Sequence, residues 1–138
     1  MTLNKCTEQE LYSWIKKNFI KDLALTTQQH SRYDCYSDEF NLDIELKCRR
    51  KHYNDLIIEK KKYDALMFRC NTYETIPVYI NSTPKGIWAF YIADIRMSWE
   101  EKMLPKQTDF SNHTFINKKI SYLRLESGVD LISIAGRF

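Results

Sequence analysis

Two acidic residues and a lysine, Asp34, Glu45 and Lys47, have the types and spacing that metal-assisted chemistry on a phosphate requires. A pair of carboxylates can hold Mg²⁺ or Mn²⁺, which keeps several waters and also binds substrate phosphate. Such an ion polarises the phosphate and activates water. A lysine beside it places positive charge where the transition state gains negative charge. This chemistry requires that the fold bring the three side chains to one face.

The segment NLDIELKCR, residues 41–49, alternates apolar and charged residues. This pattern predicts a strand with one face on the core. The opposite face would then carry Asp43, Glu45, Lys47 and Arg49. A solvated outer face or a ladder of salt bridges would give the same alternation, so this strand alone does not identify a site.

The preceding segment, residues 31–37, is a second strand candidate, and the polar DEFN at 38–41 suits a hairpin loop. A four-residue loop places Asp34 directly opposite Glu45, with Cβ atoms roughly 5 Å apart. Like charges so placed are destabilising unless something, such as a divalent cation, binds between them. A loop one residue longer would turn Asp34 to the other face. Asp43 shares the face of Glu45 and is the alternative first metal ligand.

The rest of the chain predicts the elements that position this hairpin. Thr7 and Glu10 fit a capping box at the start of a helix that runs to about Lys21, and Glu8 lies at the edge of its apolar face. Over residues 98–117 the apolar residues follow neither a clear helical nor a clear strand period. Further strands are expected at 55–59, 76–82, 87–95, 118–125 and 129–134, and a second helix at 60–70. The strand at 55–59 is almost continuously apolar, which predicts burial on both faces. The order α-β-β-β-α-β-β predicts a sheet flanked by helices in one α/β domain, residues 1–138.

The composition sets limits on the class of protein. The chain has 138 residues, 43% hydrophobic, which is enough for one globular domain. We expect a cytosolic protein that does not enter a membrane, because no apolar run approaches the roughly 20 residues of a membrane span and no secretory signal is evident. The four cysteines form no C-x-x-C pair and are expected to be free thiols. The net charge of +3 is compatible with a polyanionic partner.

The pattern Asp-x(10)-Glu-x-Lys across two adjacent strands resembles the PD-(D/E)XK nuclease superfamily. Further similarity, to small phage-type members and to archaeal Holliday-junction resolvases, lies in residues 33–66, in the Lys62-Tyr63 helix start and in the segments PVYINSTPKGIWAFYIADI and LPKQTDFSNHTFINKKISYLRL. The resemblance implies a restriction-endonuclease-like αβββαβ core with a mixed central sheet. It also implies a Mg²⁺- or Mn²⁺-dependent endonuclease that hydrolyses branched, nicked or duplex DNA. A phage or mobile-element origin, with action in the host cytoplasm, and a homodimer follow by analogy only.

The resemblance also assigns roles to individual residues. Asp34 and Glu45 match the two metal ligands, Lys47 the catalytic lysine, and Glu8 the helix glutamate that assists metal binding. Lys62 matches a helix lysine that can face the site. Arg49, Arg50 and Lys51 follow the strand and are candidates for contact with the DNA backbone, although a charged loop explains them equally well. The alternative function is a non-catalytic phage accessory protein that binds nucleic acid or protein and keeps the nuclease fold.

Overall fold

The computed structural model describes residues 2–26, 34–106 and 114–138. The helices of this part are α1 (Glu8–Asn18), α2 (Lys60–Tyr73) and α3 (Leu131–Ala135), with short 3₁₀ turns η1 (Leu3–Lys5), η2 (Ile92–Asp94) and η3 (Leu125–Ser127). The strands are β1 (Ala24–Leu25), β2 (Asp34–Ser37), β3 (Leu42–Cys48), β4 (Asp55–Glu59), β5 (Ile76–Thr83), β6 (Gly86–Tyr91), β7 (Glu100–Pro105), β8 (Phe115–Arg124) and β9 (Val129–Asp130).

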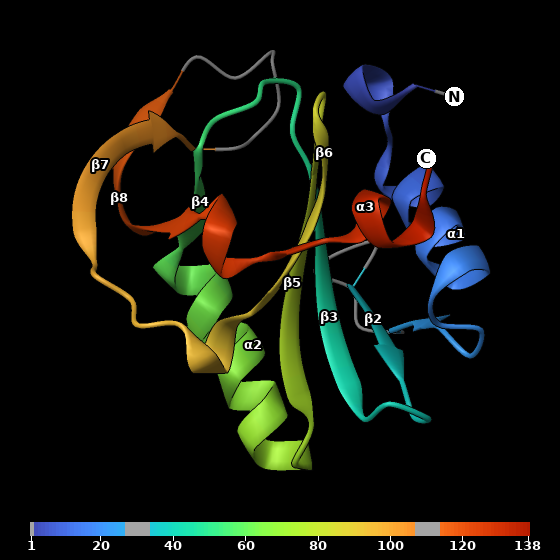
Figure 1. The fold of residues 1–138 in the computed structure, drawn as a ribbon. Helices are drawn as coiled ribbons and strands as arrows, with labels where there is room; N and C mark the ends of the chain where they lie inside the picture. The colour runs from blue at the N-terminus through green and yellow to red at the C-terminus, as the bar shows by residue number, and fades with distance from the viewer. Residues whose placement is uncertain (1, 27–33, 107–113) are drawn as a thin grey trace.

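A mixed central sheet organises the molecule. Its order is β1-β2-β3-β5-β6-β9, in which β3 and β5 are parallel and the other neighbours are antiparallel. The parallel pair requires a crossover, which runs through β4 and α2. In Figure 1, α1 and α3 lie on one side of this sheet, and α2 and a second sheet lie on the other. This arrangement confirms the predicted α/β class with a mixed central sheet.

The core has two parts, one on each face of the central sheet. On the α1 side, Leu11 and Ile15 pack against Ile44 of β3 and Val78 of β5. The helix starts where the sequence predicts, because Thr7 and Glu10 form the expected capping box. On the other side, α2 packs with the second sheet through Leu66, Cys70, Leu56, Ile58 and Leu123.

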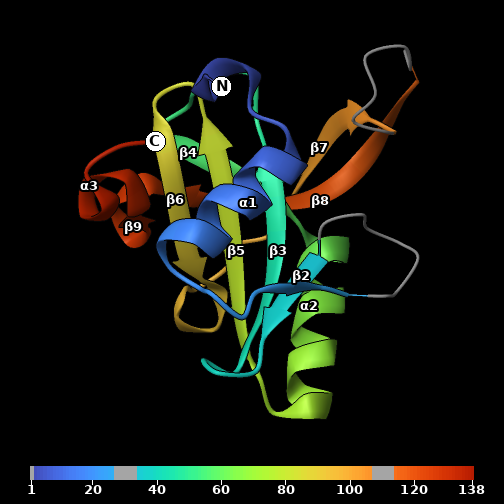
Figure 2. The ribbon, with the colours of Figure 1, turned by 90° about the vertical axis from the view of Figure 1, so that its right-hand side faces the viewer.

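The second sheet was not expected from the sequence. Its order is β4-β8-β7, all antiparallel, and Figure 2 shows it projecting from the central sheet. The prediction that 55–59 is buried on both faces is wrong, because only Leu56 and Ile58 reach the core while Ile57 and Glu59 are half-buried. Strand β7 lacks an apolar period because it is an edge strand whose Glu100, Glu101 and Lys102 are exposed.

Several other predictions differ at element ends. The strand expected at 87–95 ends at Tyr91 and is followed by η2, the strand expected at 118–125 begins at Phe115, and the helix expected at 60–70 runs to Tyr73. Helix α1 ends at Asn18 rather than about Lys21. The segment 129–134 is a two-residue strand followed by α3, because the Asp130 side chain accepts a hydrogen bond from Ser133 N and caps the helix. The predicted strand at 31–37 is seen from Asp34 onward, and residues 31–33 lie outside the described part.

The four cysteines are free thiols, as expected from the sequence, and Cys35 and Cys70 are buried. In the described ranges of the chain, no helix has the length and apolar character needed to cross a bilayer.

Candidate active site

The hairpin β2–β3 places Asp34 directly opposite Glu45. This register confirms the four-residue loop at 38–41, in which Asn41 takes a left-handed conformation with φ 56° and its N–H donates to Asp38 O. Asparagine tolerates this conformation better than most residues. The two carboxylates therefore leave neighbouring strands on the same face, at the separation of a cross-strand pair.

The charged face of β3 is covered rather than solvated. Asp43 and Glu45 are only 7% and 8% exposed, because α2 packs across this side of the central sheet. A solvated outer face is therefore wrong for these two residues. Charges buried in this way require compensation by opposite charge or hydrogen bonds.

The compensation for Asp43 comes from α2 and from the turn that follows it. Thr75 Oγ1 donates to Asp43 Oδ2 at 2.6 Å, and Arg69 Nε lies 3.3 Å from Asp43 Oδ1. Both carboxylate oxygens thus have protein partners. These contacts hold Asp43 more closely within the fold than Asp34 is held.

Asp34 is held less completely. Its Oδ2 lies 3.8 Å from Arg69 Nη1, which is a weak ion pair. Its Oδ1 is buried and accepts no hydrogen bond within the described ranges. A buried carboxylate oxygen without a donor is costly, unless a ligand occupies the position beside it.

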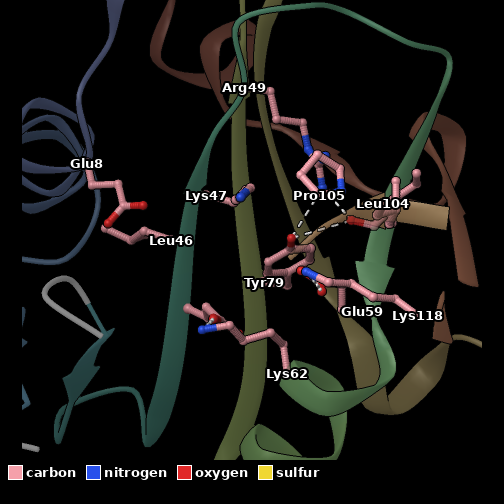
Figure 3. Close-up of a pocket in the computed structure, with 12 residues that line it drawn as sticks. Glu8, Leu46, Lys47, Arg49, Glu59, Lys62, Tyr79, Leu104, Pro105 and Lys118 are labelled. Atoms are coloured by element: carbon pink, nitrogen blue, oxygen red, sulfur yellow. Dashed lines mark hydrogen bonds and ion pairs between the residues drawn. The ribbon is translucent and has the colours of Figure 1, made fainter. Parts of the chain in front are cut away.

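A pocket of about 280 Å³ opens along β3 beside this pair. Residues from α1, β3, β4, α2, β5, β7 and β8 form its wall, and Figure 3 shows them around the end of β3. The lining residues are Glu8, Glu45, Leu46, Lys47, Arg49, Ile57, Glu59, Lys62, Tyr79, Leu104, Pro105 and Lys118. The fold thus brings Glu8, Glu45, Lys47, Arg49 and Lys62 of the predicted set to one pocket. Asp34 lies beside it, opposite Glu45.

Burial dominates the electrostatics of Glu45. It raises the pKa of the Glu45 carboxyl from 4.5 to about 7, against the opposing effect of the Lys62 ammonium. Lys62 Nζ lies 3.4 Å from Glu45 Oε1 and is itself 49% exposed. Lys62 therefore stands at the mouth of the pocket, between the buried carboxylate and solvent.

Lys47 points from β3 into the same pocket (Figure 3). Burial, and then the nearby Arg49 guanidinium, lower the pKa of its ammonium, while Glu59 and Glu8 act in the opposite direction. No hydrogen bond or ion pair joins Lys47 Nζ to another of the residues that the structure describes. The ammonium thus faces the open space of the pocket.

Glu8 reaches the pocket from the first turn of α1. Figure 3 shows it on the α1 side of β3, whereas Lys47 lies on the other side. Assistance to a metal by Glu8 stays a prediction, and it would have to act around β3. Glu8 is half-buried. It lies on a helix, so hairpin register does not place it opposite another carboxylate in the way that it places Asp34 opposite Glu45.

Arg49, predicted to contact DNA, is part of the pocket wall. Its Nε donates to Asn81 Oδ1 at 2.7 Å, and its Nη2 donates to Ile57 O and, at 3.2 Å, to Tyr79 Oη. These bonds link β3, β4 and β5. Arg50 and Lys51 are exposed on the loop beyond β3. Contact of the three residues with nucleic acid stays a prediction.

Several pocket or supporting residues were missed from the sequence, among them Arg69, which contacts Asp34 and Asp43, and Thr75, which contacts Asp43. Tyr79 and Asn81 alternate within the buried strand β5, opposite Glu45 and Lys47 in the parallel register. A polar residue at alternate positions of an otherwise apolar strand is the signal that could have found them. Glu59 and Lys118 form an ion pair of 2.8 Å between β4 and β8. No local pattern pairs residues so distant in the chain.

The oxygen donors at this site suit a divalent cation that takes few ligands from the protein. Within the described residues, no three His, Cys, Asp or Glu side chains group closely enough to hold a metal ion by themselves. Two opposed carboxylates, one with a buried oxygen lacking a donor, fit an ion that keeps water and substrate oxygens as its other ligands. The residues present therefore fit Mg²⁺ or Mn²⁺ better than a cation with an all-protein ligand shell.

Comparison with known proteins supports the fold. No protein-family model matches the chain, and no curated protein matches its sequence. Among solved structures, the chain is similar to Hjc of Archaeoglobus fulgidus, described as a Holliday junction resolvase from an archaeal hyperthermophile. The identity is 16% and the TM-score is 0.56, over 95% of this chain and 93% of that chain. This likeness confirms the predicted resolvase-type, restriction-endonuclease-like fold.

The buried Glu45 carboxyl predicts a pH dependence of stability in the absence of metal. Between pH 4.5 and about 7 the unfolded chain releases this proton and the folded chain retains it, so stability falls as pH rises through this interval. Across this interval the free energy of unfolding should fall by about 3 kcal/mol. We expect Glu45→Gln to remove this loss and to gain stability relative to wild type from pH 5 to pH 8.

Urea unfolding at pH 5 and at pH 8, in EDTA, measures this change in the free energy of unfolding. Glu10→Gln is the matched control, because Glu10 lies in the capping box outside the pocket. Parallel pH profiles for wild type and Glu45→Gln would contradict the prediction.

Proposed function

We propose that the chain is a metal-dependent endonuclease that hydrolyses DNA phosphodiester bonds, with branched DNA as its favoured substrate. The observation that carries the proposal is the opposed pair Asp34 and Glu45, with Lys47 on the same face of β3. Asp34 Oδ1, buried without a donor in the described ranges, supports a ligand-binding role for this pair. The likeness to a Holliday junction resolvase supports the substrate class.

Asp34 and Glu45 would hold Mg²⁺ or Mn²⁺, and Lys62 balances the charge of Glu45 until the ion binds. When bound, the ion supplies Lewis-acid polarisation of the phosphate and an activated water. Lys47 would hold a phosphate oxygen and offset the negative charge that develops on it. Glu8, at the rim, is the further carboxylate for orienting water or assisting the metal.

The walls of the pocket have a separate task. Arg49 bonds Tyr79 and Asn81 of β5 and the backbone of β4, so the end of β3 that carries Lys47 is tied both to the neighbouring strand β5 and to the second sheet. Fixed groups cost little reorganisation at the moment of reaction. A preformed pocket of this kind suits a phosphate that is bound and cut in place.

The proposal includes a homodimer. A four-way junction is resolved by cutting two strands, and each chain contributes one candidate site. Two-fold symmetry would place two such sites on one substrate. Light scattering of the purified protein, alone and with junction DNA, measures the subunit number.

Replacement of Lys47 tests the catalytic role directly. We expect Lys47→Ala to lower the cleavage rate of a four-way junction by about 10²- to 10³-fold, the cost of removing one preorganised group that stabilises transition-state charge. Removal of metal by EDTA should abolish cleavage, and Mg²⁺ or Mn²⁺ should restore it. Cleavage is measured on labelled junction, nicked and duplex DNA by gel electrophoresis.

Lys17→Ala is the matched control, because Lys17 lies in the last turn of α1, away from the pocket. Equal melting temperatures of the variants show that the fold survives. Inert wild-type protein on every DNA, with or without metal, would contradict the enzyme and favour a non-catalytic binding module of the same fold.

Asp34 and Asp43 should respond differently to loss of charge. We expect Asp34→Asn to abolish metal-dependent cleavage with little loss of stability, because Asp34 makes only a weak ion pair. Asp43→Asn should mainly destabilise the fold, by about 1–3 kcal/mol, since it weakens a buried carboxylate that bonds Thr75 and faces Arg69. Urea unfolding and Mn²⁺ titration by calorimetry separate the two effects. The reverse pattern would make Asp43 the metal ligand.

A further inference from the structure

A second hollow adjoins the candidate active site. It has a volume of about 640 Å³ and lies between the start of α2 and strand β8, next to the end of β7. Figure 1 shows these elements together, on the opposite side of the central sheet from α1. Five lysines line it, namely Lys60, Lys61, Lys106, Lys118 and Lys119, against the acidic residues Glu59 and Asp64. We call this hollow the lysine groove.

The lysine groove begins where the active-site pocket ends. Glu59 and Lys118 line both hollows, and their ion pair of 2.8 Å lies at the boundary. Figure 3 shows the two side chains on the β4 and β8 side of the pocket. A chain-like ligand held at Lys47 and Glu45 can therefore continue over this ion pair into the groove.

The charge of the lysine groove is only partly compensated by the protein. Lys60 pairs with Asp64 at 2.8 Å, and Lys118 pairs with Glu59. Lys61, Lys106 and Lys119 form no ion pair with another of the described residues. Three such ammonium groups around one hollow repel one another, and an anionic ligand relieves that repulsion.

We propose that the lysine groove binds the sugar–phosphate backbone of the nucleic acid strand whose scissile phosphate lies at Lys47. A nucleic acid fits better than an acidic protein segment, because the groove is continuous with a site suited to a phosphate. A strand carries a phosphate at every nucleotide, so it can occupy both hollows at once. The inference rests on the proposed function for its choice of ligand.

Binding without cleavage tests the lysine groove. Fluorescence anisotropy of a labelled four-way junction is measured with wild-type protein and with the triple variant Lys61→Ala, Lys106→Ala and Lys119→Ala, in EDTA, over a range of salt. We expect the triple variant to bind at least about tenfold more weakly near 0.1 M salt. The slope of log K against log salt should become shallower by roughly 2 to 3, because about 0.9 is lost per phosphate contact on duplex DNA.

Two control variants isolate the groove. Replacement of Lys5, Lys17 and Lys21 by alanine removes the same charge on the α1 side of the molecule. Replacement of Lys61, Lys106 and Lys119 by arginine keeps the charge and should keep the affinity. Equal weakening by both alanine triples, at unchanged melting temperatures, would overturn the proposal. A third outcome is that polyglutamate displaces the labelled junction as well as unlabelled DNA of the same total charge does, and that the groove triple no longer binds polyglutamate. That outcome would assign the groove to acidic proteins instead.

The outcomes for the groove and for the proposed function are separate. If the wild-type protein cuts DNA and the groove triple binds and cuts it equally well, the proposed role of the lysine groove is overturned and the proposed endonuclease activity stands. If the wild-type protein binds but does not cut DNA, and the groove triple no longer binds it, the endonuclease activity is overturned and the lysine groove is supported as a nucleic acid surface.

Discussion

The burial of acidic side chains on β3 beneath α2 is the constraint on which the candidate site depends. Asp43 and Glu45 lose most of their solvent in this position, and α2 supplies the opposite charges, Arg69 and Lys62, that make the burial tolerable. Arg69 is divided between Asp43 and Asp34, and its closer contact is with Asp43. Asp43 is thereby the better compensated of the two, whereas Asp34 Oδ1 has no hydrogen-bond donor among the described residues.

The pocket is completed by elements that meet only in the folded chain. The crossover between β3 and β5 carries β4 into a second sheet, and the outer face of that sheet then closes the pocket opposite Lys47. Arg49 joins the two sheets by bonding Asn81 and Tyr79 on one side and Ile57 on the other. A residue predicted to contact DNA thus has a role in holding the walls together, which a strand pattern cannot reveal.

The part of the site that follows from local sequence was predictable. The polar loop at 38–41 and the alternation of β3 were enough to place Asp34 opposite Glu45, because hairpin register depends on loop length. The second sheet was not predictable, because β7 is a charged edge strand and β4 pairs with a distant β8. For the same reason the ion pair of Glu59 and Lys118 could not be predicted. The contacts of Asp43 with Thr75 and Arg69 could not be predicted either, because they depend on where α2 packs.

The pairing distances along the chain imply an order of assembly. Asp34 and Glu45 are eleven positions apart in a hairpin, whereas β4 and β8 join residues more than sixty positions apart. Loop-closure entropy favours the near contact, so the acidic hairpin can form early in folding and the wall opposite it forms late. During that interval the chain would carry paired carboxylates without an enclosed pocket, and the pocket itself would form only in the last steps of folding.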